Sequence, residues 1–168
     1  QTGEAPANSL ISVPAGTVRI GKAYNDAYYG WDNEYGEHQA EVEKFKASKY
    51  LVSNQEFLSF VEAEGYRQDR YWSNEGRSWR DFAGATHPTF WRWHNGWHLR
   101  LMTEEVPMPW DWPAEVNYHE AKAFCEWKGE QTGQPVRMPT EDEWYRLCAE
   151  SGVQEVGAPP ANANLHLD

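Results

Sequence analysis

The sequence predicts an α+β fold with much irregular structure, and three observations lead to that prediction. Three helix-start signals are spread along the chain, short alternating stretches typical of strands lie between them, and nothing has the strand–helix–strand order of a parallel sheet. Each helix signal is a capping residue followed three positions later by Glu, so that both side chains satisfy backbone N–H groups of the first turn. The pairs are Ser53 with Glu56, Asn117 with Glu120, and Thr140 with Glu143.

The N-terminal part is predicted to form strands and one long loop. Residues 1–9 are small and polar, so we expect a linker or a fragment edge there and a domain over residues 10–168. Residues 10–21 are predicted to be a hairpin that turns at Pro14-Ala15-Gly16. Residues 24–38 are rich in Tyr, Trp, Asp and Gly without periodicity, which indicates either a functional or a packed loop. A strand is expected over residues 42–51.

The helices are predicted to be amphipathic, because apolar residues recur three and four positions apart after each capping residue. A further short helix is expected near residues 78–82. The helices should end at glycines, namely Gly65, then Gly129 or Gly133, then Gly152. The residues predicted to face the core are Phe57, Phe60, Val61, Ala121, Phe124, Cys125, Trp144, Leu147 and Cys148.

A hairpin is predicted over residues 90–102, because Asn95-Gly96 is the preferred two-residue turn with positive φ at both positions. Counting outward from such a turn, His94 faces Trp97 and Trp93 faces His98. This register places His94 and His98 on opposite faces.

Composition excludes several classes of partner. The 168 residues carry a net charge of −11 and a pI near 5.0, which argues against a nucleic-acid or anionic-membrane partner. No apolar run is long enough to cross a bilayer. Cys125 and Cys148 are not at the spacing of a disulfide framework, so a cytoplasmic setting is expected.

Four groups of residues are candidates for chemistry. His94 and His98 form an H-x3-H pair that suits a metal on a helix, but the hairpin register favours ordinary surface histidines. The acids Asp32, Glu34 and Glu37, with His38, either gather a cation or polar substrate or form a solvated acidic loop. The two cysteines are expected to be inert thiols on helix faces. The tryptophans form either a recognition wall or the core; they are Trp72, Trp79, Trp91, Trp93, Trp97, Trp110 and Trp112.

Three stretches resemble the formylglycine-generating-enzyme domain, also called the sulfatase-modifying factor domain. They are residues 45–57 (FKASKYLVSNQEF), residues 115–127, and residues 137–144 (RMPTEDEW), the last similar to the family's R-L-P-T-E-A-E-W-E signature. The resemblance extends over residues 10–168. It implies a C-type-lectin-like α+β fold with little regular secondary structure, of which this chain would be the N-terminal portion.

Within that family, residues 30–36 (GWDNEYG) and 102–113 (MTEEVPMPWDWP) are similar to the 5-histidylcysteine sulfoxide synthases of ovothiol biosynthesis. Ergothioneine and selenoneine synthases are the close alternative. The resemblance implies an iron-dependent oxidoreductase that uses Fe(II) and O₂ to join cysteine sulfur to the histidine ring as a sulfoxide. Outside the synthases, the same resemblance is compatible with a non-catalytic lectin-like binding or structural module. It is also compatible with a true formylglycine-generating enzyme, whose paired copper-binding cysteines would lie beyond this chain.

The resemblance also implies that much of the active site lies elsewhere. In these synthases an H-x3-H-x-E motif of a DinB-like helical domain holds the iron, and further substrate-binding residues belong to the C-terminal part of the domain. We therefore expect no catalytic residue and no iron ligand here, and an inactive chain when it is alone. The loop residues Trp31, Asp32 and Glu34 are the substrate-binding candidates. Asn164 and Leu165 match a Ca²⁺ site of the family, with Asn162 an equal match for the Asn.

Overall fold

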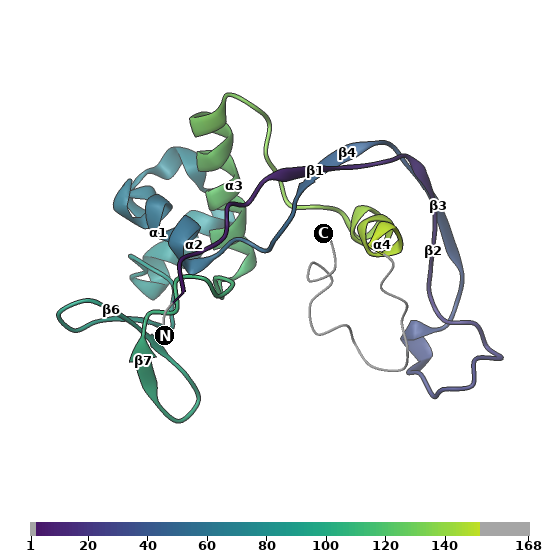
Figure 1. Cartoon of the computed structure of the whole chain (residues 1–168). Helices are drawn as coiled ribbons and strands as arrows, with labels where there is room; N and C mark the ends of the chain where they lie inside the picture. The colour runs from purple at the N-terminus through teal and green to yellow at the C-terminus, as the bar shows by residue number, and fades with distance from the viewer. Residues whose placement is uncertain (1–2, 152–168) are drawn as a thin grey trace. The chain divides into compact units, whose positions relative to one another are not determined.

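The computed structural model describes residues 3–151 and has the predicted mixture of helices and antiparallel strands (Figure 1). The chain divides into two compact units. Among the described residues, unit 1 comprises the segment up to Ala7 together with Leu51–Met138, and unit 2 comprises Asn8–Tyr50 together with the residues from Pro139 onward. The predicted domain boundaries at residues 9 and 10 stay a prediction.

The described part of unit 2 contains two antiparallel strand pairs, one α-helix and the short 3-10 helix η1 (Asp32–Glu34). Strand β1 (Leu10–Val13) pairs with β4 (Phe45–Ser48), and β2 (Gly16–Ile20) pairs with β3 (His38–Val42). Figure 1 shows the two pairs following one another as a ribbon. Helix α4 (Glu141–Glu150) packs on β1, β2 and β3. The buried apolar residues in the described part of this unit are Leu147 of α4 and Val13, Val18 and Val42 of the strands.

The predicted hairpin over residues 10–21 is wrong, although both of its strands exist. β1 and β2 pair with later strands, because each obtains a ladder of four or five residue pairs there. The Pro14 carbonyl accepts a hydrogen bond from Nε of Arg146 at 3.0 Å. This carbonyl is therefore bonded to a side chain of α4 and not within a hairpin turn. The strand predicted over residues 42–51 is split between the end of β3 and β4.

Unit 1 contains three helices and a three-stranded antiparallel sheet. The helices are α1 (Asn54–Glu62), α2 (Asn74–Ala83) and α3 (Tyr118–Thr132), with the short 3-10 helices η2 (Gly65–Arg67) and η3 (Asp69–Tyr71) between α1 and α2. The strands are β5 (Trp91–Trp93), β6 (Trp97–Arg100) and β7 (Glu105–Pro107), in the order β5-β6-β7.

The helix-start predictions are confirmed. In α1, α3 and α4 the capping side chain accepts a hydrogen bond from the backbone N–H three residues later, and the Glu at that position accepts one in return. Gly133 ends α3 in the left-handed conformation, with φ of 64°. Helix α1 does end before Gly65, as predicted, but the left-handed conformation expected at Gly65 is adopted by Glu64. Gly65 is needed for space, since a Cβ there would lie 2.0 Å from the Phe60 ring.

The core of unit 1 is aromatic. Phe57, Phe60 and Trp91 are at most 1% exposed, and Phe57 stacks on Phe124 of α3 with ring centroids 5.3 Å apart. Four of the residues predicted to face a core are buried, namely Phe57, Phe60, Phe124 and Leu147. Trp144 is exposed, and the others are half-buried, namely Val61, Ala121, Cys125 and Cys148.

The hairpin over residues 90–102 exists, but its predicted register is wrong by one residue. Trp93 pairs with Trp97, so that the loop has three residues, and Arg92 pairs with His98. Asn95 and Gly96 do take the positive φ predicted for them, at 56° and 140°. A three-residue loop also accommodates residues with positive φ, so the Asn-Gly pair does not by itself fix the loop length. The observed register places the Trp93 and Trp97 rings in contact across the strands.

Candidate functional site

The loop between β2 and β3 is closed at its base by backbone hydrogen bonds. The Lys22 N–H donates to the Glu34 carbonyl at 2.8 Å, and the Gly36 N–H donates to the Lys22 carbonyl at 3.1 Å. The Tyr35 hydroxyl accepts a bond from the buried Gly30 N–H at 3.1 Å. The chain between these points is therefore an ordered loop, which we call the aromatic loop (residues 22–36).

The aromatic loop presents its rings to solvent. Tyr24, Tyr29 and Trp31 are 85%, 84% and 68% exposed. The Tyr24 ring stacks on Tyr35 with centroids 5.1 Å apart, and Tyr29 meets Trp31 edge to face at 6.3 Å. Exposed aromatic surface on a loop is typical of a contact site, because a partner that covers it removes that surface from water.

The acids of this loop do not gather into one site. Glu34 accepts the Trp31 N–H at 2.6 Å as part of the turn of η1 (Asp32–Glu34), and Asp32 accepts the neighbouring Asn33 N–H at 3.0 Å. His38 pairs instead with Asp142 of α4 at 3.2 Å. The cation site hypothesised for these residues is therefore not formed, and their hydrogen bonds match the turn-forming alternative.

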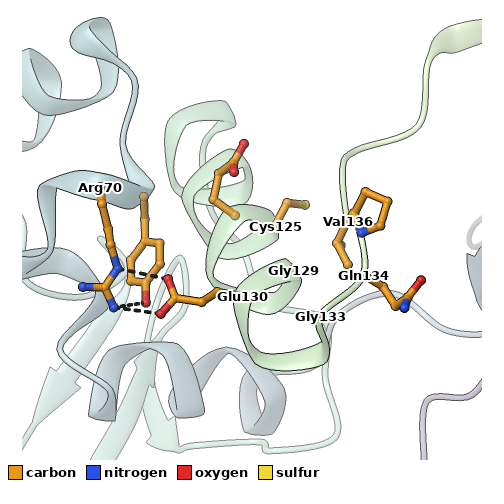
Figure 2. Close-up of a pocket in the computed structure, with 10 residues that line it drawn as sticks. Arg70, Cys125, Gly129, Glu130, Gly133, Gln134 and Val136 are labelled. Carbon is orange, nitrogen blue, oxygen red and sulfur yellow. Dashed lines mark hydrogen bonds and ion pairs between the residues drawn. The ribbon is translucent and has the colours of Figure 1, made fainter.

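A pocket of about 510 Å³ lies in unit 1, between η3, α3 and the segment after α3 (Figure 2). Arg70 donates two hydrogen bonds of 3.0 Å to the Glu130 carboxylate and one of 2.7 Å to the Tyr71 hydroxyl. These bonds from Arg70 hold the pKa of Glu130 below its usual range. The charges of Arg70 and Glu130 compensate each other, so Glu126 is the remaining charged side chain among the residues that line the pocket.

Cys125 also borders this pocket and is not a nucleophile near neutral pH. Burial raises the pKa of its thiol to about 11, so the thiolate is scarce. This agrees with the sequence interpretation of an inert thiol. The pocket itself was not predicted, because its charged pair joins residues 60 positions apart and no local motif marks it.

Glu120 of α3 is a buried carboxyl group in unit 1. It is 2% exposed, its Oε1 accepts the Tyr66 hydroxyl at 2.5 Å, and its Oε2 accepts the Asn117 N–H at 2.9 Å. Burial raises the pKa of this carboxyl, more strongly than the two hydrogen bonds lower it. The sequence had identified Glu120 only as a helix-capping residue.

The described residues do not fit an iron site. Among residues 3–151, no three His, Cys, Asp or Glu side chains are grouped so as to hold a metal ion. His94 pairs with Glu105 at 3.2 Å, and Nδ1 of His98 lies 3.1 Å from the Gly96 carbonyl oxygen. The prediction that His94 and His98 lie on opposite faces of the hairpin is wrong. In the observed register they lie on the same side, with ring centroids 5.8 Å apart. The calcium candidates Asn162, Asn164 and Leu165 lie outside the described residues.

No helix in the described part of the chain combines the length and apolar character needed to cross a membrane. Cys125 and Cys148 are not joined to each other in a disulfide.

The sequence profile of the sulfatase-modifying factor enzyme 1-like domain matches residues 1–158, so the chain belongs to this family. It is 37% identical over 132 residues to the hercynine oxygenase of Mycolicibacterium thermoresistibile, which covers 77% of this chain and 28% of that protein. It is 38% identical over 120 residues to the hercynine oxygenase of Mycobacterium tuberculosis, covering 70% and 26%.

A more distant relative is the formylglycine-generating enzyme of Thermomonospora curvata, 28% identical over 177 residues, covering 93% of this chain and 53% of that enzyme. The chain therefore spans about half of this enzyme and less than a third of the two hercynine oxygenases. The resemblance noted in the sequence is confirmed at the level of the family.

Proposed function

We propose that this chain is a segment of an ergothioneine-type sulfoxide synthase. Such an enzyme is an oxidoreductase that uses Fe(II) and O₂ to join a cysteine-type sulfur to the imidazole of a histidine derivative, here hercynine. One observation carries the proposal: the chain is 37% and 38% identical to two hercynine oxygenases and only 28% identical to a formylglycine-generating enzyme. This supports the ergothioneine type over the ovothiol type that the sequence motifs favoured.

The part played by this chain is that of a scaffold and one wall of the substrate site. The exposed rings of the aromatic loop support this assignment, with Trp31 and Asp32 as substrate contacts and Glu34 holding the loop in shape. The iron ligands would come from a DinB-like part of the protein and further substrate contacts from a C-terminal part. The mixed helices and strands are compatible with a C-type-lectin-like fold. Two cysteines that form no disulfide with each other are compatible with a cytoplasmic location.

The test is an activity assay of the complete protein with Fe(II), O₂ and cysteine or a cysteine-containing peptide. Hercynine and histidine are supplied in parallel, and the sulfoxide product is identified by mass while O₂ consumption is followed. We expect turnover with hercynine and much less with histidine. Preferred turnover of histidine would restore the ovothiol assignment. Turnover of neither, with the iron site loaded, would reject the enzyme and favour a binding module.

The loop assignment has its own variants. Trp31→Ala removes an exposed ring and Asp32→Asn removes a charge without changing shape, while Trp112→Ala removes a ring that is 50% exposed in unit 1 and serves as the matched control. We expect the loop variants to raise KM for hercynine and the control to leave it unchanged. Equal KM values for all three proteins would remove the aromatic loop from the substrate site.

A further inference from the structure

The rings of His94 and His98 lie next to each other on the β5–β6 hairpin, with centroids 5.8 Å apart. His94 begins the three-residue loop, and His98 belongs to β6. The Gly96 carbonyl oxygen accepts the His94 backbone N–H at 2.9 Å and lies 3.1 Å from Nδ1 of His98. One backbone group of the loop therefore helps to place both residues. The His94 side chain is 60% exposed, so ions in solution can reach it.

Each of the two rings has one nitrogen bound to a hydrogen-bond acceptor. A carbonyl oxygen can only accept, so Nδ1 of His98 carries the proton and Nε2 keeps its lone pair. Nε2 of His94 lies 3.2 Å from Oε2 of Glu105, and a carboxylate also only accepts, so the neutral His94 ring keeps its lone pair on Nδ1. Histidines that bind metals typically have this arrangement, because the acceptor fixes the tautomer and makes the other nitrogen a better ligand.

Glu105 reaches His94 because a third strand completes the sheet. In the β6–β7 ladder, Pro107 is the partner of His98 and Glu105 is the partner of Arg100. Residues two apart on a strand lie on one face, so Glu105 is on the same face as His98. The carboxylate therefore comes from outside the H-x3-H motif, and the spacing of the histidines alone could not reveal it.

Two arginines share this face of the sheet, since Arg92 is the strand partner of His98 and Arg100 that of Glu105. Nη1 of Arg92 donates to the carbonyls of Thr89 and Trp91, at 2.8 Å each. The positive charges offset the Glu105 carboxylate, so this surface does not attract cations by charge alone. A cation that binds here must be held by bonds to the imidazole nitrogens.

The separation of the two rings suits a shared metal ion. Two imidazoles that bind one Zn²⁺, each at about 2.0–2.1 Å and at a near-tetrahedral angle, have ring centroids roughly 5–6 Å apart. The observed 5.8 Å lies within this range. Two side chains fill half of a tetrahedral shell, and water fills the rest. This agrees with the lack, among residues 3–151, of three His, Cys, Asp or Glu side chains grouped to hold a metal.

We propose that His94 and His98 form a surface site for a divalent transition ion that prefers imidazole, such as Zn²⁺ or Cu²⁺. His98 binds the ion through Nε2 and His94 through Nδ1, while Glu105 orients the His94 ring. Ca²⁺ and Mg²⁺ do not suit the site, because they prefer oxygen ligands. The proposal goes beyond the proposed function and does not rest on it.

The test is the protection of histidines from diethyl pyrocarbonate, which modifies free imidazole nitrogens, in the complete protein titrated with Zn²⁺. Tryptic cleavage after Arg92 and Arg100 releases both histidines in one peptide (residues 93–100), and fragmentation of that peptide distinguishes them. We expect Zn²⁺ to protect the two together.

His38 is the matched control within the same sample. Its side chain is 62% exposed and also pairs with a carboxylate at 3.2 Å, that of Asp142. In the described part of the chain, His94 and His98 are the only histidine rings in contact with each other, so His38 has no second imidazole beside it. Protection of His94 and His98 should need roughly tenfold less Zn²⁺ than protection of His38, because the second imidazole binds intramolecularly.

Two variants separate the ligands from the orienting group. In His94→Gln, we expect protection of His98 to fall to the level of His38, because one ligand remains. Glu105→Gln keeps both ligands and should raise the Zn²⁺ concentration needed by about tenfold. Near-ultraviolet circular dichroism verifies the fold of each variant.

Three outcomes would overturn the proposal. The first is protection of His94 and His98 that needs as much Zn²⁺ as protection of His38. The second is unchanged protection of His98 in folded His94→Gln. The third is equal protection when Mg²⁺ replaces Zn²⁺, because a site made of imidazoles should discriminate against that ion.

Discussion

The two units use large apolar side chains in opposite ways. In unit 1, Phe57, Phe60 and Trp91 are at most 1% exposed and pack on one another. In the described part of unit 2 the buried apolar residues are smaller, namely three valines and Leu147, while Tyr24, Tyr29 and Trp31 are exposed on a loop. Large rings thus fill the core of unit 1, whereas those of the aromatic loop in unit 2 are exposed to solvent.

The hydrophobic stabilisation of the chain is therefore expected to differ between the two units. A buried aromatic ring removes about 150–250 Å² from water, so most of the hydrophobic stabilisation belongs to unit 1. The described part of unit 2 is held by backbone ladders, the cap of α4 and four smaller buried side chains, namely Val13, Val18, Val42 and Leu147. Substitutions in the two units should therefore differ in their cost.

The largest effect is expected for Phe60→Ala. Phe60 is 0% exposed, and its loss should lower the free energy of unfolding by about 3–5 kcal/mol through lost burial and a cavity. Phe82→Ala is the matched control, because that ring is 93% exposed and should change stability by less than about 0.5 kcal/mol. Urea unfolding measures both, and equal effects would refute the assigned core.

Leu147→Ala should be the most damaging single truncation of an apolar side chain in unit 2. We expect a loss of about 2–3 kcal/mol, because Leu147 is the buried contact of α4. Leu10→Ala, at a position 65% exposed, is the control and should have little effect. Unfolding followed by circular dichroism compares them. A larger effect at Leu10 would place the core of unit 2 elsewhere.

Glu120 should make the stability of unit 1 depend on pH. Because burial raises its folded-state pKa above the ordinary value of 4.5, its contribution is fully present below that value. The contribution is lost as pH rises through the raised pKa, at no more than about 1.4 kcal/mol per pH unit. Glu120→Gln does not titrate, so the stability difference between the unaltered protein and the variant should fall with pH. A difference that rises with pH would contradict a raised pKa.

The cap of α4 should be worth less than its buried leucine. Thr140→Ala removes the hydroxyl that accepts the Glu143 N–H at 3.2 Å and should cost about 1 kcal/mol. Thr140→Ser keeps the acceptor and should lose much less. Thermal unfolding compares the two variants, and equal losses would show that the methyl group matters and the cap does not.

The smallest effect is expected for the displayed rings. Tyr29→Ala and Trp31→Ala should each change the free energy of unfolding by less than about 0.5 kcal/mol, because these rings are largely exposed. Chemical unfolding provides the measurement. A loss comparable to that of Phe60→Ala would mean that the aromatic loop is structural and not a contact surface.

The sequence predicted features that depend on neighbouring residues and missed those that depend on distant ones. The caps at Ser53, Asn117 and Thr140 were correct, because a side chain and a backbone group three residues apart decide them. Strand partners and hairpin register were wrong, because packing of distant residues selects among ladders of similar local quality.

In the candidate site, too, the sequence predicted local features and missed those that depend on distant residues. Composition located the aromatic loop with Trp31, Asp32 and Glu34, but it could not show that Glu34 is used within the turn. The Arg70–Glu130 pair and the burial of Glu120 against Tyr66 arise only when separate helices meet.

The contrast between the units is tested most directly by native-state hydrogen exchange of backbone amides. We predict that amides of α1 and α3 around Phe57, Phe60 and Phe124 exchange slowest, through global unfolding, and that amides of β2 and β3 exchange faster through local opening. Equal or greater protection of the β2–β3 ladder would contradict the claim that the aromatic core of unit 1 carries most of the stability.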